Sequence, residues 1–420
     1  MKLPLFLKNL ALWLLLPAIA GSAAQAAILP DEAQVRQALQ QHPRVLAASA
    51  KRDAQFAKSE QLRAGSHQTT LRTSLQRRRV SDVNDHFGEG QVALERSFRL
   101  PQKARADASL AGLTEQAANI ELQDALHETA RELLRLWFAG TRTLAEAQHA
   151  EQAVRLHDDL ASLVAKRVKA GDASRLEADL VQAERDRARA MLGLARARLQ
   201  AAGQSVAARF PGVTLPEPMA LPEWISPLPA DAADAGRELL RAEYLAASHE
   251  LRLARADAEH SRGIAQRQSL ERLPDPTLGV FYSNERNGAE RVIGLSVAIP
   301  FSGAGSAAGA RAAYFEANAA QARVADLERK VGADFDMLWI DAQAKRSAAL
   351  ALADAARMQA EALRKTIRAY GLGEAPLADV LLARKASAES TLAARIAALD
   401  IAEATDRLRL DLHQIWDFDE

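Results

Sequence analysis

The side chains that could bind a metal ion or transfer a proton are dispersed along this chain of 420 residues. The chain has no cysteine, and its nine histidines are His42, His67, His86, His127, His149, His157, His249, His260 and His413. His149 and His157 share one expected helix, but a spacing of about two turns is too wide for a common ion. We therefore interpret the histidines as solvated helix residues and expect no metal site.

Motifs for covalent or nucleotide chemistry are also missing from the sequence. It has no nucleophile elbow, no cluster of metal ligands at short spacing and no phosphate-binding loop. Gly303 and Gly305 open an expected helix, where they act as a turn device and give only a poor nucleotide signal. We expect no catalytic residue, no cofactor and no enzyme activity.

The charge pattern argues against a nucleic-acid partner. The chain has 54 basic and 54 acidic residues and a formal net charge of zero, so it has no polybasic surface by composition. Basic and acidic residues alternate along expected helices, as in residues 184–187, which is typical of solvated helix faces. Aromatic residues make up 5% of the chain, which is little for a large globular core.

The N-terminal segment has the features of a secretory signal peptide. Lys2 and Lys8 give it a positive start, and residues 10–19 are apolar but too short to span a membrane. A small-x-small sequence at residues 24–26 fits a cleavage site, so we expect residues 1–26 to be removed. Without cysteine the exported protein has no lipid-anchored cysteine and no disulfides, so it is not a lipoprotein.

The positions of proline predict two very long helical hairpins. No proline lies between Pro300 and Pro376, and the residues between them are strong helix formers. About 65 such residues give a helix roughly 100 Å long, deeper than an ordinary globular core. A glycine-containing turn ends this helix before Pro376, and a return helix follows it. The stretch between Pro101 and Pro211 has the same design.

Matching positions in the two halves predict an internal duplication. The sequence LAAS begins at Leu46 and again at Leu245, an offset of 245 − 46 = 199, and Pro101 and Pro300 also differ by 300 − 101 = 199. Residues 27–210 and 231–420 form the two repeats, and the proline-rich residues 211–230 link them. Each repeat contains helices, then a β-hairpin and then a long helical hairpin. The β-hairpins are expected at about 68–100 and 276–300, and the long helical hairpins at about 102–209 and 304–416.

The expected strands require assembly of several chains. Alternating apolar residues at 92–100 and 291–299 indicate strands, although the first strand of the first hairpin is unusually polar. Four strands cannot close a barrel, since about eight are the usual minimum, and open strand edges have no hydrogen-bond partners in lipid. The predicted fold class is mainly α with a small β part, and three chains would contribute twelve strands.

At the two tips the sequence resembles the TolC family of outer-membrane efflux channels. Each tip carries the family's glycine, then a small residue or proline three positions later, then a carboxylate six positions later: Gly171, Ser174 and Glu177, and Gly373, Pro376 and Asp379. Tyr370 lies three positions before the second glycine, also as in the family. The resemblance covers essentially the whole mature chain.

The resemblance implies a channel. Three copies would form a 12-stranded β-barrel in the outer membrane of a Gram-negative cell and an α-barrel through the periplasm. The tips would form a gate that meets a periplasmic adaptor protein and an inner-membrane pump. A ring of carboxylates, Asp379 first and Glu177 second, would set cation preference, and Tyr370 would hydrogen-bond across neighbouring helices. Alternatively, both carboxylates simply cap and solvate the return helices. Ala375 and Leu382 replace an arginine and an acid that some members carry.

Two short segments resemble the heavy-metal and cation efflux branch, which works with resistance-nodulation-division pumps. They are LPDPT at residues 273–277 and IPF at residues 299–301. A duct for drugs or other organic compounds, or for type I secretion, stays open as an alternative. More remote alternatives are a periplasmic adaptor, which would have one hairpin flanked by β-rich domains, and a coiled-coil envelope protein, which would lack the paired strand segments.

Overall fold

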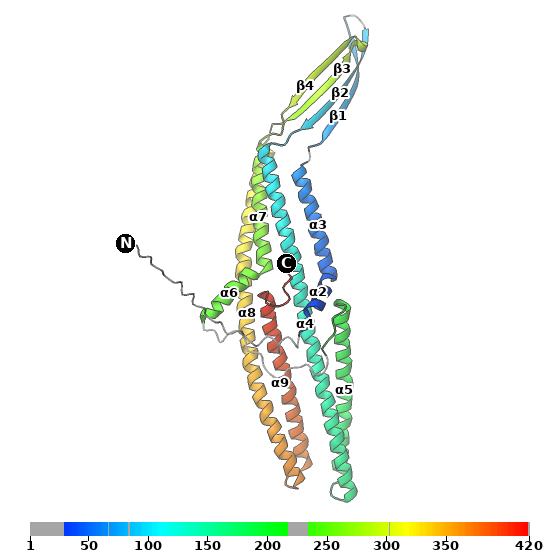
Figure 1. Ribbon diagram of the computed structural model, residues 1–420, viewed down its shortest axis with the longest axis vertical. Helices are drawn as coiled ribbons and strands as arrows, with labels where there is room; N and C mark the ends of the chain where they lie inside the picture. The colour runs from blue at the N-terminus through cyan, green and yellow to red at the C-terminus, as the bar shows by residue number, and fades with distance from the viewer. Residues whose placement is uncertain (1–28, 66, 83–84, 217–233, 302, 419–420) are drawn as a thin grey trace, which may run out of the picture.

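Long helices make up the body of the molecule, and a small sheet lies at one end of it (Figure 1). The computed structural model describes residues 29–65, 67–82, 85–216, 234–301 and 303–418. The expected signal peptide lies outside these residues, as do most of the proline-rich linker and the centre of the first β-turn. The molecule is mostly helical with one small sheet, as the sequence predicted.

Two helices run most of the length of the body. They are α4 (Pro101–Ala170), with 70 residues, and α8 (Ala304–Gly371), with 68 residues, so each is about 100 Å long. Pro101 occupies the first turn of α4, where its missing N–H costs nothing. The return helices α5 (Arg175–Arg209) and α9 (Leu377–Asp411) pack against α4 and α8 respectively, which gives two long hairpins.

Shorter helices cover the half of the body nearer the sheet. Helix α2 (Glu32–Gln40) is capped by Asp31, and α3 (Pro43–Ala64) packs along α4. Helices α6 (Asp234–Ala247) and α7 (His249–Ser269) follow the linker, and a 3-10 turn, η1 (Leu270–Arg272), ends α7. Helix α7 packs against both α4 and α8 and so joins the two halves of the chain.

The four strands form one antiparallel sheet in the order β1-β2-β3-β4. They are β1 (Thr69–Val80), β2 (Asp85–Ser97), β3 (Thr277–Glu285) and β4 (Glu290–Ala298). Pairing of β2 with β3 joins the two hairpins. In the turn η2 (Arg286–Gly288), Asn287 has φ 55°, and its Oδ1 accepts a hydrogen bond of 2.6 Å from the Gly88 N–H.

One face of the sheet exposes rows of apolar side chains. The strand register places Leu71, Leu94, Val280 and Leu295 in one row, and these side chains are 52–81% exposed. Val92, Tyr282 and Ile293 form the next row on the same face and are also exposed. Because successive residues alternate between the faces, the other face carries polar residues such as Gln91 and Ser283. The sheet therefore presents an apolar face that no described part of this chain covers.

The main core lies near the middle of the body, where the most helices meet. Leu133, Leu134, Trp137 and Phe138 of α4 are at most 3% exposed there and pack with residues from α2, α9 and the segment after α5. Tyr244, Phe335 and Trp339 form a neighbouring cluster between α6 and α8. Several of the few aromatic residues are thus buried in these two clusters.

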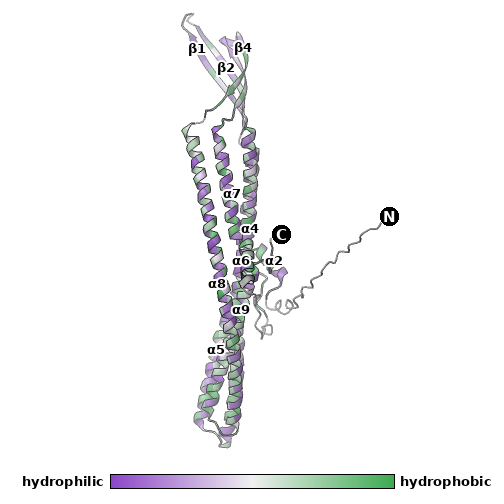
Figure 2. Cartoon of the chain, turned by 90° about the vertical axis from the view of Figure 1, so that its left-hand side faces the viewer, coloured by the Kyte–Doolittle hydropathy of each residue, from purple (hydrophilic) through white to green (hydrophobic). Residues whose placement is uncertain are grey.

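The large apolar side chains of the first long hairpin, formed by α4 and α5, are only partly buried. Leu160 and Val164 are buried, whereas Leu156, Leu163, Leu176, Leu180 and Leu194 are 46–67% exposed. Figure 2 shows hydrophobic and hydrophilic residues interleaved along the whole length of the helices. Among the described residues, no helix combines the length and the apolar character needed to cross a membrane.

Candidate functional site

The first tip joins α4 to α5 through a tight turn that local hydrogen bonds fix. Gly171 adopts φ 84°, a left-handed conformation that favours glycine, and the Asp172 N–H reaches back to the Arg167 carbonyl at 2.9 Å. Ser174 and Glu177 form a reciprocal capping box: the Glu177 N–H donates to Ser174 Oγ at 3.1 Å, and the Ser174 N–H donates to Glu177 Oε2 at 2.9 Å. The Glu177 carboxylate therefore caps its own helix.

The second tip has the same path with different chemistry. Gly373 adopts φ 77°, and the Glu374 N–H donates to the Ala369 carbonyl at 2.9 Å. Pro376 is the N-cap residue of α9 and offers no side-chain cap. Asp379 lies in the first turn of α9 and is exposed. A carboxylate in this position is stabilised by the positive N-terminal end of the helix dipole and remains exposed to water.

An apolar cluster, here called the tip cluster, joins the two hairpins near their ends. It consists of Leu160, Val164, Val181, Tyr370, Leu377 and Val380, which come from all four long helices. Tyr370 is 8% exposed, and the Arg167 guanidinium lies 4.8 Å from the centre of its ring. The Tyr370 hydroxyl is buried without a hydrogen-bond partner among the described residues. Within this chain the tyrosine therefore links helices through its ring, not through the expected hydrogen bond.

Arginines along α4 and α9 connect the hairpins above the tip cluster. Arg384 of α9 donates to the Leu156 carbonyl at 2.7 Å, and Arg142 of α4 donates to Asp400 at 2.7 Å and also pairs with Glu403. These contacts leave no local pattern in the sequence, because the partners are about 230 to 260 positions apart. The structure brings Tyr370 to the first hairpin, whereas Glu177 and Asp379 stay on separate tips.

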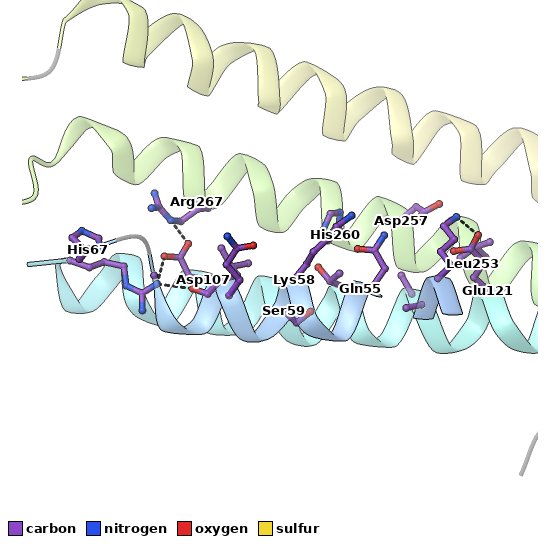
Figure 3. A pocket seen from close by; sticks show the side chains of 18 of the residues that line it. Gln55, Lys58, Ser59, His67, Asp107, Glu121, Leu253, Asp257, His260 and Arg267 are labelled. Atoms are coloured by element: carbon purple, nitrogen blue, oxygen red, sulfur yellow. Dashed lines mark hydrogen bonds and ion pairs between the residues drawn. The ribbon is translucent and has the colours of Figure 1, made fainter. Parts of the chain in front are cut away.

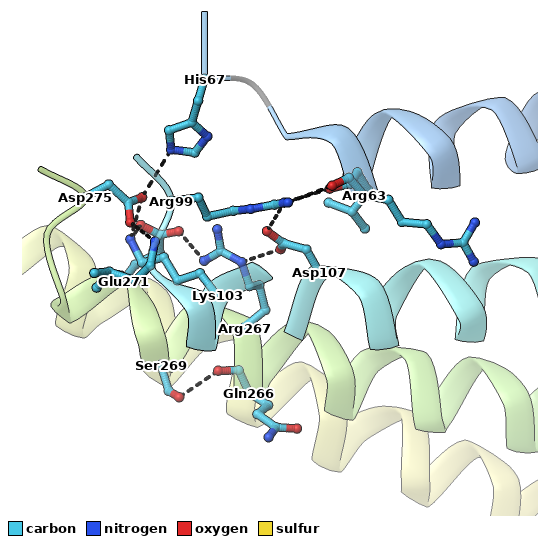
Figure 4. Close-up of polar contacts among 12 residues, drawn as sticks. Arg63, His67, Arg99, Lys103, Asp107, Gln266, Arg267, Ser269, Glu271 and Asp275 are labelled. Carbon is cyan, nitrogen blue, oxygen red and sulfur yellow. Dashed lines mark hydrogen bonds and ion pairs between the residues drawn. The ribbon is translucent and has the colours of Figure 1, made fainter. Parts of the chain in front are cut away.

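The other end of the helical body contains a network of buried charges beneath the sheet, here called the junction network (Figure 4). Lys103 is 2% exposed and donates to Glu271 at 3.2 Å and to Asp275 at 3.0 Å. Asp107 is 3% exposed, accepts from Arg99 at 2.8 Å and pairs with Arg267. Asp275 also accepts from the Leu100 N–H at 3.1 Å. The segment at residues 273–277 thus docks the start of β3 onto the start of α4.

A cleft with charged walls lies beside this network (Figure 3). Its volume is ≈ 870 Å³, and side chains of α3, α4 and α7 line it. Lys58, Asp257 and His260 point into it together with the Asp107 and Arg267 pair. Burial lowers the pKa of His260 and raises the pKa of Asp257, which favours the neutral forms of both groups.

Three of the nine histidines meet near the middle of the body, although the sequence showed them as scattered. His127 of α4, His249 at the start of α7 and His413 just after α9 have ring centres 4.7–5.4 Å apart. Asp411 lies beside them, 1% exposed, and accepts from His127 at 3.2 Å and from Arg131 and Arg407 at 2.8 Å. Although burial opposes ionisation, these donors hold the pKa of Asp411 well below its usual range. No spacing in the sequence could have revealed this cluster.

Comparison with known proteins identifies the fold. The sequence matches no protein-family model and no curated protein. Solved structures do match. The outer membrane protein VceC of Vibrio cholerae has a TM-score of 0.68 at 19% identity, with coverage of 92% of this chain and 95% of that one. CusC, described for its transmembrane channel formation, has a TM-score of 0.68 at 16% identity, with coverage of 95% of each chain.

The open-state outer membrane channel MtrE of Neisseria gonorrhoeae has a TM-score of 0.68 at 16% identity, with coverage of 91% of this chain and 88% of that one. The structural neighbours of this chain are thus outer-membrane efflux channels of the TolC family. At these identities the likeness concerns the fold. It extends over most of each protein.

Proposed function

We propose that this chain is an outer-membrane channel that acts as the exit duct of an efflux system and works as a homotrimer. The observation that carries the proposal is the exposed apolar face of the sheet at the end of a helical body about 100 Å long. Apolar residues facing outward and polar residues facing inward are the pattern of a strand in lipid. The likeness to solved outer-membrane channels supports the same location.

The sheet also has two open edges. Strands β1 and β4 each pair on one side only among the described residues. In a homotrimer, β1 of one copy would pair with β4 of the next. This pairing would close a barrel of twelve strands and leave no unpaired strand edge exposed to lipid. The exposed leucines of α4 and α5, such as Leu163 and Leu176, would pack against a neighbouring copy in the periplasmic α-barrel.

The tips form the gate in this proposal. They lie at the end of the body opposite the sheet (Figure 1), so they face the inner membrane when the sheet is in the outer one. Asp379 of three copies would form an exposed ring of like charge that favours cations. Glu177 would contribute less, because its carboxylate already serves the capping box. The tips would also meet the periplasmic adaptor protein and, through it, the inner-membrane pump.

The proposed cargo is a heavy-metal cation delivered by a resistance-nodulation-division pump, with organic compounds or type I secretion substrates as the alternative. The support is the resemblance of residues 273–277 and 299–301 to the cation branch. Growth of a strain lacking the protein, on divalent metals, copper or silver and on detergents, dyes and antibiotics, separates the two. Sensitivity confined to metals supports the cation duct, and sensitivity confined to organic compounds contradicts it.

The experiment that tests the duct is a matched pair of arginine substitutions on β2. Leu94→Arg places a charge on the exposed apolar face, whereas Gln91→Arg places it on the polar face of the same strand. A lipid-facing arginine costs about 2–4 kcal/mol at the bilayer midplane. We expect Leu94→Arg to abolish trimers in outer-membrane extracts and currents in planar bilayers, and Gln91→Arg to retain both. Equal behaviour of the two variants, or a wild-type protein that is a clean monomer in mild detergent, would contradict the proposal.

A further inference from the structure

The histidine cluster at the middle of the body has the composition of a metal site. His127, His249 and His413 each offer a ring nitrogen, and these three atoms lie within 4.8 Å of one another. The three residues come from α4, from the start of α7 and from the segment after α9, so the fold alone brings them together. We propose that they bind one divalent transition ion of the zinc type per chain.

Imidazole nitrogen is a preferred ligand of such ions, and three histidines with one open position are a known coordination set. With ion–nitrogen bonds of about 2.0–2.1 Å in tetrahedral geometry, neighbouring ligand nitrogens are roughly 3.3 Å apart. Closing from the separations in this structure requires only small side-chain rotations. The ring centres are 4.7–5.4 Å apart, so the three imidazoles already lie close together.

Carboxylates support two of the rings. Asp411 lies 3.2 Å from His127 Nε2, and Asp417 lies 3.5 Å from His413 Nδ1. A ligand histidine commonly gives its second N–H to a carboxylate, which fixes the tautomer and leaves the other nitrogen for the ion. Asp411 is itself held by Arg131 and Arg407 at 2.8 Å, so it cannot turn away from His127.

The surroundings favour a bound cation. A cavity of ≈ 410 Å³ reaches His127 and His249 from outside. Its lining has four carboxylates and two guanidiniums: Asp124, Glu250, Asp334 and Asp341, and Arg131 and Arg407. The excess of acidic groups favours entry of a cation.

The backbone at His413 is a second, independent observation. Helix α9 ends in a Schellman motif, with the Gln414 N–H on the Arg409 carbonyl at 2.8 Å and the His413 N–H on the Leu410 carbonyl at 3.0 Å. Glycine usually fills the left-handed position of this motif, yet His413 fills it here with φ 58°. His413 thus adopts an unfavourable backbone conformation, and in this conformation its ring stacks on the ring of His249.

A bound ion would connect the segment at the C-terminal end of α9 to α4 and to the start of α7. These elements come from both halves of the chain, and the site lies far from the tips and from the sheet (Figure 1). The ion would therefore stabilise the body, as a resident ion and not as cargo. This inference does not depend on the proposed transport function.

The test measures zinc binding by the full chain in detergent, purified without a polyhistidine tag. Competition with a chromophoric chelator should give one Zn²⁺ per chain. His127→Gln and His249→Gln should each weaken binding by roughly 100-fold or more, since loss of a mere supporting group already costs about 10–100-fold. His413→Gly removes a ligand but keeps the left-handed turn, so it should lose zinc while remaining at least as stable as the metal-free wild type. His149→Gln on α4 and His260→Gln on α7 are the controls and should bind normally.

Two further readouts separate a specific site from loose binding. Co²⁺ in place of Zn²⁺ should give visible absorption bands of low-coordinate nitrogen ligation in the wild type and in both controls, but not in His413→Gly. Zinc should raise the thermal midpoint of the wild type only when the cluster is intact. If the wild type binds no more zinc than His413→Gly, or if the control variants lose as much affinity, the cluster is packing of stacked imidazoles and the proposal is wrong.

Discussion

The two ends of the long helices are held by opposite kinds of interaction. Under the sheet, the junction network joins β3, α4 and α7 through buried ion pairs centred on Lys103 and Asp107. At the tips, six apolar residues form the tip cluster, and the carboxylates lie outside it. A buried ion pair tolerates little displacement, because separation leaves an unpaired charge in the protein interior, which solvates charge poorly. A small apolar cluster can shift and repack at lower cost.

This difference fits a body that is fixed where it meets the sheet and able to move where it is proposed to open. The capping box of the first tip and the left-handed glycine of each tip fix the path of the two turns. Movement of the tips would therefore shift one hairpin relative to the other. This shift would rearrange the tip cluster and the arginine contacts between α4 and α9. The comparison predicts that substitutions at the junction cost overall stability, whereas those at the tips act locally.

The largest effect is expected at the junction. Asp107→Ala leaves Arg99 and Arg267 without their shared carboxylate and should lower the free energy of unfolding by about 3–5 kcal/mol. Thermal unfolding in detergent measures this loss. Glu115→Ala is the control, since it removes the partner of Arg63 two turns further along α4, where the pair is more exposed. Equal losses for the two variants would show that burial of the junction network does not matter.

A smaller and local effect is expected in the tip cluster. Tyr370→Ala removes a buried ring and should weaken the contact between the hairpins by about 3 kcal/mol. Hydrogen exchange should rise near residues 160–181 and 367–381 and stay unchanged near residue 103. Tyr370→Phe keeps the ring and should behave as the wild type. If Tyr370→Phe instead loosens the tips, the hydroxyl forms a hydrogen bond in the assembly, as the family resemblance implied.

The smallest effect on stability is expected for the two tip carboxylates. Glu177→Gln removes a charge but keeps a capping box, and Asp379→Asn removes the exposed charge of the other tip. Both should change the free energy of unfolding by less than about 0.5 kcal/mol. In planar bilayers, Asp379→Asn should reduce cation selectivity more than Glu177→Gln. Unchanged selectivity in both would assign the two residues to plain helix capping.

Much of the fold was predictable because its signals are local. The proline-free runs predicted α4 and α8, the glycines at 171 and 373 predicted the tip turns, and alternation predicted β2 and β4. The polar strand β1 was also found at the expected place. Only the strand register reveals that its Leu71 lies opposite Leu94 on the apolar face. The apolar residues of the first hairpin are only partly buried in a single chain, and the periodicity of a sequence does not say which partner covers a face.

The sequence by itself therefore determined the helices, the strands and the turns, since these depend on residues a few positions apart. Only the tertiary structure decided which distant side chains meet. It placed Asp275 in the junction network, the Tyr370 ring against Arg167 and the three histidines around one point. His127, His249 and His413 lie far apart along the chain, and only the packing of α7 between α4 and α8 and the turn after α9 bring them together. Contacts of this kind follow from how whole helices pack, which no local pattern of residues encodes.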